Sequence, residues 1–345
     1  MSDLPEPPPL VLAIETSCDE TAVSIARGTT EILCSEIASQ IAIHKPYGGV
    51  VPELASRNHN LAIQPVIKAA LKNANVDLSQ LDAVAATAGP GLASSLLIGD
   101  TTGKALALGL GKPFYSINHM EGHLLSPFIG DDRGIRESIA LVVSGGHTLI
   151  VKINAVDEYE VLGSTKDDAA GEAFDKVAKM LELPYPGGPE IDKLAREGDS
   201  KAFDLPRSMI DSGDFQFSFS GLKTAVFYLL QKLPETLSDT DLKNVCASFQ
   251  QAVIDVLVSK TIAAAKQTGS TLVAVSGGVS CNSQLRNDIT AACETAGLEL
   301  AIATPHHSTD NAAMIAFTAA ARMDAGIAPS LLNTDVNPNL KLAAG

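Results

Sequence analysis

Two runs of short strands, far apart along the chain, share one plan and constrain the fold more than any other feature. In each run an apolar strand leads through a polar turn into two further strands, over residues 10–39 and again over residues 138–163. A repeat of this kind, spaced by roughly 130 residues, indicates an internal duplication. We therefore predict an α/β fold built from two related halves.

The segments between and after these runs read mainly as helices with single buried strands among them. Helices are expected at about 51–73, 91–109, 167–182, 190–197, 220–232 and 240–268, and from 283 and 310; single strands are expected at 81–87, 272–276 and 299–303. Duplicated sheets with glycine turns around a nucleotide cleft resemble the actin-like ATPase (ASKHA, RNase H-like) fold. The expected organisation is a disordered tail (1–9), an N-terminal subdomain (10–130), a C-terminal subdomain (131–330) and a tail (331–345). The final helix, from about 310, is expected to be able to pack back on the first subdomain.

Composition narrows the class of protein. The chain has 345 residues, of which 46% are hydrophobic, enough for two cores. Its five cysteines form no C-x-x-C pair and no uninterrupted apolar run reaches the length of a membrane span, so we expect a cytoplasmic protein with no membrane contact. A net charge of −15 argues against binding nucleic acid through general electrostatics alone.

Two histidines four residues apart, His119 and His123, form the clearest candidate metal site. On a helix this spacing separates the side chains by only about 40°, which lets both imidazoles reach one ion. Zinc proteases of the H-E-x-x-H type place a glutamate directly after the first histidine, whereas Met120 stands there and Glu121 points away.

The histidine pair needs a third ligand from elsewhere in the chain. Asp310 would complete a set of two histidines and one carboxylate, which suits Fe(II), with Zn(II) as the alternative. Asp310 also reads as the N-cap of the last helix, and His306 and His307 are rival ligands.

Glycine turns after buried strands form a second group of candidates. The turn Ser144-Gly145-Gly146-His147 offers backbone amides that suit an anion, or is an ordinary hairpin turn. Asn282, at the start of a helix after Gly277-Gly278, either caps that helix or binds a nucleotide. Asp192, which follows the Tyr185–Pro189 turn, could accept a hydrogen bond from a ligand.

The motifs occur in an order that resembles one family, the bacterial TsaD family of tRNA N6-adenosine threonylcarbamoyltransferases. The likeness runs from about 10 to 325 and rests on Ile14–Thr21, Gly48–Glu53, Gly89–Leu92, His119–His123, Ser144–Thr148, Asp167–Lys176, Tyr185–Pro189, Phe217–Thr224, Gly277–Asn282 and Thr309–Asn311.

The resemblance implies a complete reaction. The threonylcarbamoyl group passes from threonylcarbamoyl-adenylate to the N6 amine of the adenosine beside the anticodon, in tRNAs that read codons beginning with A, and AMP leaves. It implies one divalent metal, an iron-type ion, held by His119, His123 and Asp310. It implies a TsaB-like paralogue and a TsaE-like ATPase as partners. The implied donor contacts are Val142, Val143, Ser144, Gly145, Gly146, Asp175, Gly188, Asp192 and Asn282.

The residues leave several alternatives open. A metallopeptidase would use the histidine pair, a non-catalytic scaffold paralogue would need no metal, and a sugar-kinase-like ATPase would share the fold. The catalytic base is not identifiable, although Glu15 and Asp19 are candidates. The C-terminus, Asn337–Gly345, lacks the basic and aromatic ending associated with the bacterial members.

Overall fold

The computed structural model describes residues 7–342 and separates the chain into two compact units. Unit 1 comprises the chain up to Ile135 together with the chain from Asp310 onward, and unit 2 is Arg136–Thr309. The last helix therefore belongs to unit 1, although the chain that leads to it, up to Thr309, belongs to unit 2. Of the tail expected at 1–9, only 7–9 lie in the described part, and there the carbonyl of Pro9 accepts a hydrogen bond from the Gly28 amide.

Unit 1 contains a five-stranded mixed sheet in the order β3-β2-β1-β4-β5. The strands are β1 (Leu10–Glu15), β2 (Glu20–Arg27), β3 (Glu31–Ser39), β4 (Ala83–Gly89) and β5 (Phe114–Asn118). The first three form an antiparallel meander, and β4 and β5 continue parallel to β1. Every residue of β1 is buried, as expected for a central strand covered on both faces.

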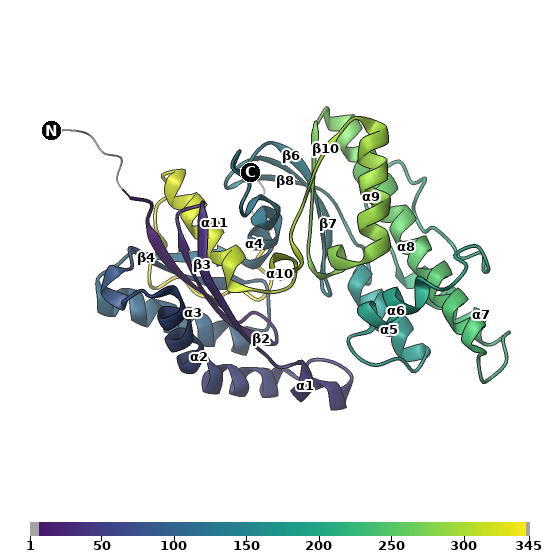
Figure 1. The fold of residues 1–345 in the computed structure, drawn as a ribbon, viewed down its shortest axis with the longest axis horizontal. Coiled ribbons are helices and arrows are strands. Elements are labelled where there is room, and N and C mark those ends of the chain that lie inside the picture. The colour runs from purple at the N-terminus through teal and green to yellow at the C-terminus, as the bar shows by residue number, and fades with distance from the viewer. Residues whose placement is uncertain (1–6, 343–345) are drawn as a thin grey trace. The chain divides into compact units, whose positions relative to one another are not determined.

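Helices cover both faces of this sheet (Figure 1). On one face Leu12 and Ile14 pack with residues of α2 (Pro52–Ala74) and α3 (Ala93–Leu110). On the other face Val11 and Ala13 pack with α11 (Ala312–Asp324), because successive side chains of a strand point to opposite faces. The short helix α4 (His119–Leu125) contacts α11, and α1 (Ile41–His44) follows β3.

Unit 2 repeats the same sheet, in the order β10-β9-β6-β7-β8. Its strands are β6 (Ser138–Val143), β7 (Thr148–Ala155), β8 (Glu158–Ser164), β9 (Leu272–Ser276) and β10 (Glu299–Ile302). The meander β6-β7-β8 is antiparallel, and β9 and β10 are parallel to β6. The order and directions match unit 1 strand for strand, which confirms the duplication predicted from the sequence.

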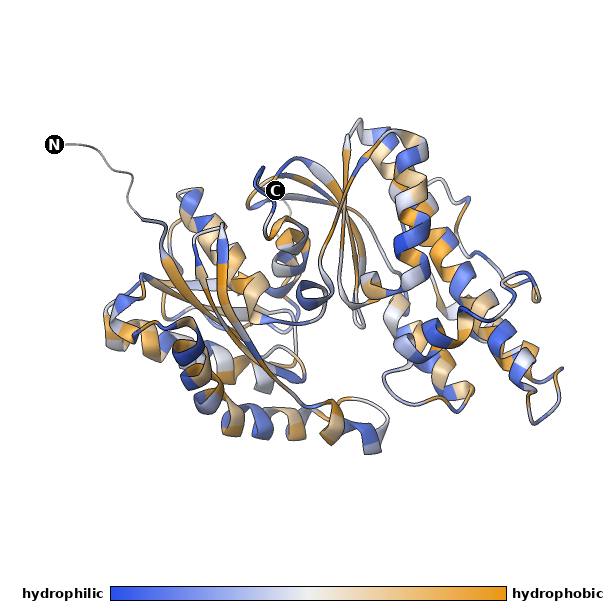
Figure 2. Cartoon of the chain, viewed as in Figure 1, coloured by the Kyte–Doolittle hydropathy of each residue, from blue (hydrophilic) through white to orange (hydrophobic). Residues whose placement is uncertain are grey.

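The helices of unit 2 are α5 (Ala170–Met180), α6 (Gly187–Ala195), α7 (Ser220–Leu230), α8 (Asp239–Thr268), α9 (Ser283–Ala296) and α10 (Pro305–Ser308). Most helices of both units mix hydrophobic and hydrophilic residues along their length (Figure 2), as helices do when one face packs on a core. Among the described residues, α8 alone is long and apolar enough to cross a membrane; 72% of its most apolar window is buried, so it is read as the core helix of unit 2.

Three local expectations need correction. The last helix begins at Ala312, and its N-cap is Asn311, whose side chain accepts a hydrogen bond from the Met314 amide; Asp310 lies one residue too early to cap it. Helix α5 begins at Ala170 and not at 167 as expected, so Asp168 precedes the helix. Strand β5 was not predicted, because its five residues follow Pro113 without a clear alternation.

The aromatic pair Phe174 and Phe249 tests where the stability of unit 2 resides. Both rings are buried and meet edge to face with centroids 5.1 Å apart. We expect Phe249→Ala to lower the free energy of unfolding by about 3–5 kcal/mol, because the missing ring leaves a cavity in the core beside α8. Phe227→Ala, on a side chain of α7 that is 46% exposed, is the matched control and should cost less than about 1 kcal/mol. Urea denaturation followed by circular dichroism measures both, and equal losses would contradict the assignment of the core.

Candidate functional site

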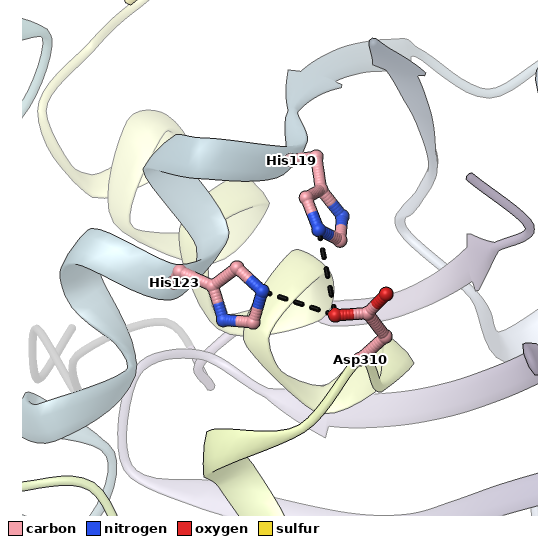
Figure 3. A group of neighbouring side chains, drawn as sticks. All are labelled: His119, His123 and Asp310. Atoms are coloured by element: carbon pink, nitrogen blue, oxygen red, sulfur yellow. Dashed lines mark hydrogen bonds and ion pairs between the residues drawn. The ribbon is translucent and has the colours of Figure 1, made fainter. Parts of the chain in front are cut away.

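The two histidines of α4 and Asp310 form a compact group within unit 1 (Figure 3). The Nε2 atom of His119 lies 3.5 Å from Oδ1 of Asp310, and the Nε2 atom of His123 lies 3.1 Å from the same oxygen. The imidazole rings meet edge-on with centroids 4.7 Å apart. Both histidine side chains are buried, whereas the Asp310 side chain is 26% exposed. The group therefore has one open side, through Asp310.

His119 and Asp310 lie at the starts of two helices, and His123 lies about one helical turn after His119. Asn118 caps α4, since its Oδ1 accepts a hydrogen bond from the Met120 amide at 2.8 Å, and His119 is the first residue of the helix. Asn311 caps α11 with its own side chain, so the carboxylate of Asp310 is not used by the helix. The two helices are in contact, and Gly122 of α4 is pressed so closely against Met314 and Ile315 that a β-carbon would lie about 3 Å from both.

A buried carboxylate backs His119 on the side away from Asp310. Oε2 of Glu15 lies 3.0 Å from Nδ1 of His119, and Ser17 Oγ lies 3.2 Å from the same nitrogen. Glu15 is held in turn by the Thr87 hydroxyl at 2.6 Å and the Ser17 amide at 2.5 Å. A carboxylate at Nδ1 favours the tautomer whose lone pair is on Nε2, the nitrogen that faces Asp310.

The charges of this cluster reinforce one another. Burial alone would lower the pKa of His119, but the carboxylates of Asp310 and Glu15 raise it well above its ordinary value. Burial alone would raise the pKa of Asp310, but His119 and His123 hold it well below its usual range. The same reasoning applies to Glu15, where burial is outweighed by His119 and the pKa is lowered. The carboxylates of Glu15 and Asp310 therefore favour a positive charge between them.

The donor set and its spacing fit a divalent metal ion. The three ligand atoms all lie within 4.8 Å of one another, and two ligands of one ion, each at about 2.1 Å, are at most about 4.2 Å apart. Small side-chain rotations therefore suffice to bring all three onto one ion. Nδ1 of His123 is buried and has no hydrogen-bond partner among the described residues, so this ring lacks the second anchor that His119 has. In the part of the chain that the structure describes, no other group of three such side chains meets the same spacing.

The rival ligands and the rival base are placed elsewhere. Nδ1 of His307, in α10 of unit 2, lies 3.2 Å from the Thr304 hydroxyl, and neither His306 nor His307 belongs to the metal group. Glu121 is buried and forms an ion pair with Arg322 of α11 at 2.9 Å. It points away from the histidines, as its helical position predicts, and is unavailable as the base of a peptidase.

The glycine turn of unit 2 joins β6 and β7. The Ser144 amide donates to the His147 carbonyl, and the His147 amide donates to Ser144 Oγ, which closes the turn. Gly171, at the start of α5, lies against this turn, and a β-carbon there would be 2.6 Å from the Ser144 carbonyl oxygen. Gly277 lies against the end of β6 in the same way, 2.3 Å from the Val143 carbonyl oxygen. These two glycines are needed for packing within the chain.

Four other glycines near these loops are not required by packing within the chain. A β-carbon on Gly145, Gly146, Gly188 or Gly278 would meet nothing within 4 Å, and none of the four has a positive φ in the range that favours glycine. Gly145 and Gly146 are exposed. The fold of the chain therefore leaves open space at these positions, which is what a bound molecule lying against the backbone requires.

The polar side chains of unit 2 that are candidates for donor contacts form hydrogen bonds with neighbouring helices. Oδ1 of Asp175 accepts a hydrogen bond from the Gly187 amide at 2.8 Å, at the start of α6. Burial raises the pKa of Asp175. Asp192 binds Ser283 Oγ at 2.7 Å and Arg196 at 2.7 Å.

Asn282 caps α9, as the simpler of its two interpretations predicts. Its Oδ1 accepts a hydrogen bond from the Leu285 amide at 3.0 Å, and its Nδ2 donates to Gln250 at 2.6 Å. Val142 and Val143 have fully buried side chains, so only their backbone could meet a ligand. Glu15 as the partner of His119 is the contact that sequence reasoning missed, although the acid at the end of β1 was a visible signal.

Comparison with known proteins identifies the family. The family model for TsaD, tRNA N6-adenosine threonylcarbamoyltransferase, matches residues 31–317. A protein of that name from Geotalea daltonii is 52% identical over 307 residues, covering 89% of this chain and 90% of its own length. Another from Variovorax paradoxus is 46% identical over 341 residues and covers 97% of each chain.

Solved structures of lower identity show the fold. HypF from T. kodakarensis is similar with a TM-score of 0.64 at 14% identity; the match covers 93% of this chain and 49% of the HypF chain. A ROK hexokinase from Thermus thermophilus matches with a TM-score of 0.51 at 13% identity, over 92% of this chain and 99% of its own. These neighbours share the ASKHA, actin-like ATPase fold. From the family model and the relatives of high identity, the chain belongs to the TsaD family of tRNA N6-adenosine threonylcarbamoyltransferases.

Proposed function

We propose that this chain transfers the threonylcarbamoyl group from threonylcarbamoyl-adenylate to the N6 amine of the adenosine beside the anticodon. The tRNAs are those that read codons beginning with A, and the second product is AMP. The observation that carries this proposal is an identity of 46–53% with enzymes of that name over nearly the whole chain. The group of His119, His123 and Asp310 supports it, because a scaffold paralogue would not need three convergent ligands. No observation favours a metallopeptidase.

The reaction requires the N6 amine to be aligned with the carbamoyl carbon of the donor, and it requires no protein nucleophile. The donor is a mixed anhydride, so the N6–carbon bond can form while the bond from the carbamoyl carbon to the phosphate oxygen breaks. The amine loses a proton, and AMP takes the bonding electrons. The exposed amides of Gly145 and Gly146 are free to hold the donor's phosphate, and the open space at Gly188 and Gly278 lets the adenylate lie on the backbone. Asp175, Asp192 and Asn282 stiffen the surrounding helix starts.

His119, His123 and Asp310 would hold one divalent metal, for which we favour Fe(II) over Zn(II) on the donor set. Such an ion supplies Lewis acidity and orients the groups that bind to it. Within the chain, Glu15 keeps a proton on Nδ1 of His119 and so presents Nε2 as a ligand. Glu15 is fully occupied by this role, which removes it as the first choice for a general base.

We further propose that the enzyme acts in the cytoplasm with a TsaB-like paralogue and a TsaE-like ATPase. The formal charge of −15 supports a need for partners, since an acidic protein gains little from the phosphates of tRNA. The adenylate donor comes from a separate synthase.

The transfer assay tests the function directly. The chain, its two partners, threonylcarbamoyl-adenylate and an unmodified tRNA that reads codons beginning with A are incubated, and the digested nucleosides are analysed by mass spectrometry. We expect threonylcarbamoyl-adenosine and an equal amount of AMP. A tRNA with guanosine in place of the target adenosine is the control and should gain nothing. With partners shown to be active on a known family member, absence of the modified nucleoside would overturn the proposal.

The metal assignment predicts that replacing His123 weakens metal binding and that replacing His307 does not. We expect His123→Ala to weaken Fe(II) or Zn(II) binding by more than the 10–100-fold that loss of an outer-shell partner costs, because a direct ligand is removed. His307→Ala, a histidine outside the metal group, is the matched control and should bind metal as the parent does. Titration calorimetry and elemental analysis measure affinity and stoichiometry, and equal affinity in both variants would refute the assignment.

Replacing Gly146 should affect adenylate binding, whereas replacing Gly171 should affect the stability of the fold. We expect Gly146→Ala to leave the melting temperature unchanged and to weaken binding of an adenylate by about tenfold, which corresponds to about 1.4 kcal/mol, because the new methyl group occupies the donor's space. Gly171→Ala should instead destabilise the fold by about 1–3 kcal/mol, since its β-carbon overlaps the Ser144 carbonyl. Calorimetry with a non-hydrolysable donor analogue and thermal melting read the two effects. Unchanged adenylate affinity in Gly146→Ala would remove this turn from the donor site.

A further inference from the structure

The chain after α11 forms a strap over the open edge of the unit 1 sheet. This C-terminal strap, residues 330–342, begins beside β5, the edge strand, where the Ser330 amide donates to the Phe114 carbonyl at 2.8 Å and Ser330 Oγ accepts from the Ser116 amide at 3.0 Å. Lys104 of α3 also donates a hydrogen bond to the Thr334 carbonyl and pairs with Asp100. The strap thus pairs with two backbone groups of the edge strand, at Phe114 and Ser116.

The middle of the strap lies directly against the end of β4 and the loop that follows it. The Asn337 amide donates to the Ala88 carbonyl at 2.8 Å, and the Gly91 amide donates to the Pro338 carbonyl at 3.1 Å. A β-carbon on Gly89 would lie only 1.9 Å from the Asn337 carbonyl oxygen, so this residue must be glycine for the strap to fit. The contact is backbone on backbone.

The end of the strap reaches the start of the metal helix. Asn118 Nδ2 donates to the Lys341 carbonyl at 3.0 Å, while Oδ1 of the same side chain caps α4 through the Met120 amide. Asn118 directly precedes His119, and the Leu342 side chain beyond this contact is buried. One amide group therefore links the strap to the first metal ligand.

A second connection runs through the loop after β4. A β-carbon on Gly91 would lie 2.6 Å from the Ser17 carbonyl oxygen, and the Leu92 amide donates to that oxygen at 2.8 Å. Ser17 Oγ in turn lies 3.2 Å from Nδ1 of His119. The loop after β4 therefore contacts the strap on one side and Ser17 on the other, and Ser17 contacts His119.

We propose that the C-terminal strap is a positioning element of the metal site, with Asn118 as its junction. It holds the start of α4 and the Gly91–Ser17 contact so that His119 presents Nε2 toward Asp310. This inference rests on the proposed metal site and adds to it a part of the chain more than 200 residues away in sequence from His119. It also gives a role to a C-terminus whose sequence departs from the pattern associated with the family.

A double-mutant cycle on the two ends of one hydrogen bond tests the proposal. Asn118→Ser keeps a good N-cap for α4 but removes the donor to Lys341. Deletion of residues 341–345 removes the acceptor. The full chain, each single variant and the double variant are freed of metal and titrated with Co²⁺ against a chromophoric chelator, and their melting curves are recorded. Asn58→Ser, in α2, is the matched substitution, because Asn58 Nδ2 donates to the Leu54 carbonyl of the same helix and not to the strap.

We expect each single variant to bind Co²⁺ about tenfold more weakly, the usual cost of losing an outer-shell contact, and the double variant to be no weaker than either. Asn58→Ser should bind as the parent does. Lower melting temperatures with unchanged Co²⁺ affinity, or effects that multiply in the double variant, would overturn the strap's role. If the deletion alone fails to fold, Asn118→Ser against Asn58→Ser still decides. A parent chain that binds no Co²⁺ would instead refute the metal site itself, and the strap proposal with it.

Discussion

The hydrogen bond between Glu15 and His119 is the interaction on which the candidate centre depends. It joins the end of the central strand to the first residue of α4, and Thr87 and Ser17 hold the carboxylate from two further directions. A buried carboxylate is costly unless it is paired and hydrogen-bonded, and His119, Thr87 and Ser17 together meet that need. The same pairing aims the opposite nitrogen of the ring at Asp310. Fold and site therefore share one constraint.

The two units use one topology for different tasks. In unit 1 the turn after the first strand is closed around Glu15 and Ser17, and it serves the histidines. In unit 2 the corresponding turn, at Ser144–His147, keeps two exposed glycines with open space around them. Duplication supplies two sheets whose strand ends can be specialised separately. The end of β1 in unit 1 places Glu15 beside His119, whereas the turn after β6 in unit 2 exposes Gly145 and Gly146.

Features that depend on neighbouring residues in the sequence were predicted well. Strand patterns predicted the duplicated meanders and the i, i+4 spacing predicted the histidine pair, and the structure contains both. Glycines after buried strands mark the candidate donor loops. Features that depend on distant partners were not predictable in this way. The sequence left Asp310 open as either a third ligand or a helix cap, and only the structure shows that Asn311 is the cap; nothing local in Asn118 shows that Lys341 meets it. The strap's hydrogen bonds are made by backbone groups in most cases, and these leave no residue-specific signal.

The central claim is that one divalent metal is held by His119, His123 and Asp310, with His119 bound through Nε2 and backed by Glu15. Crystals grown with Fe(II) under anaerobic conditions, with diffraction data collected on either side of the iron absorption edge, test it most directly. We expect a single anomalous peak within bonding distance of Nε2 of His119, of His123 and of Asp310, with Glu15 still hydrogen-bonded to Nδ1 of His119. Absence of the peak there, or a metal on Nδ1 of His119 with Glu15 displaced, would contradict it.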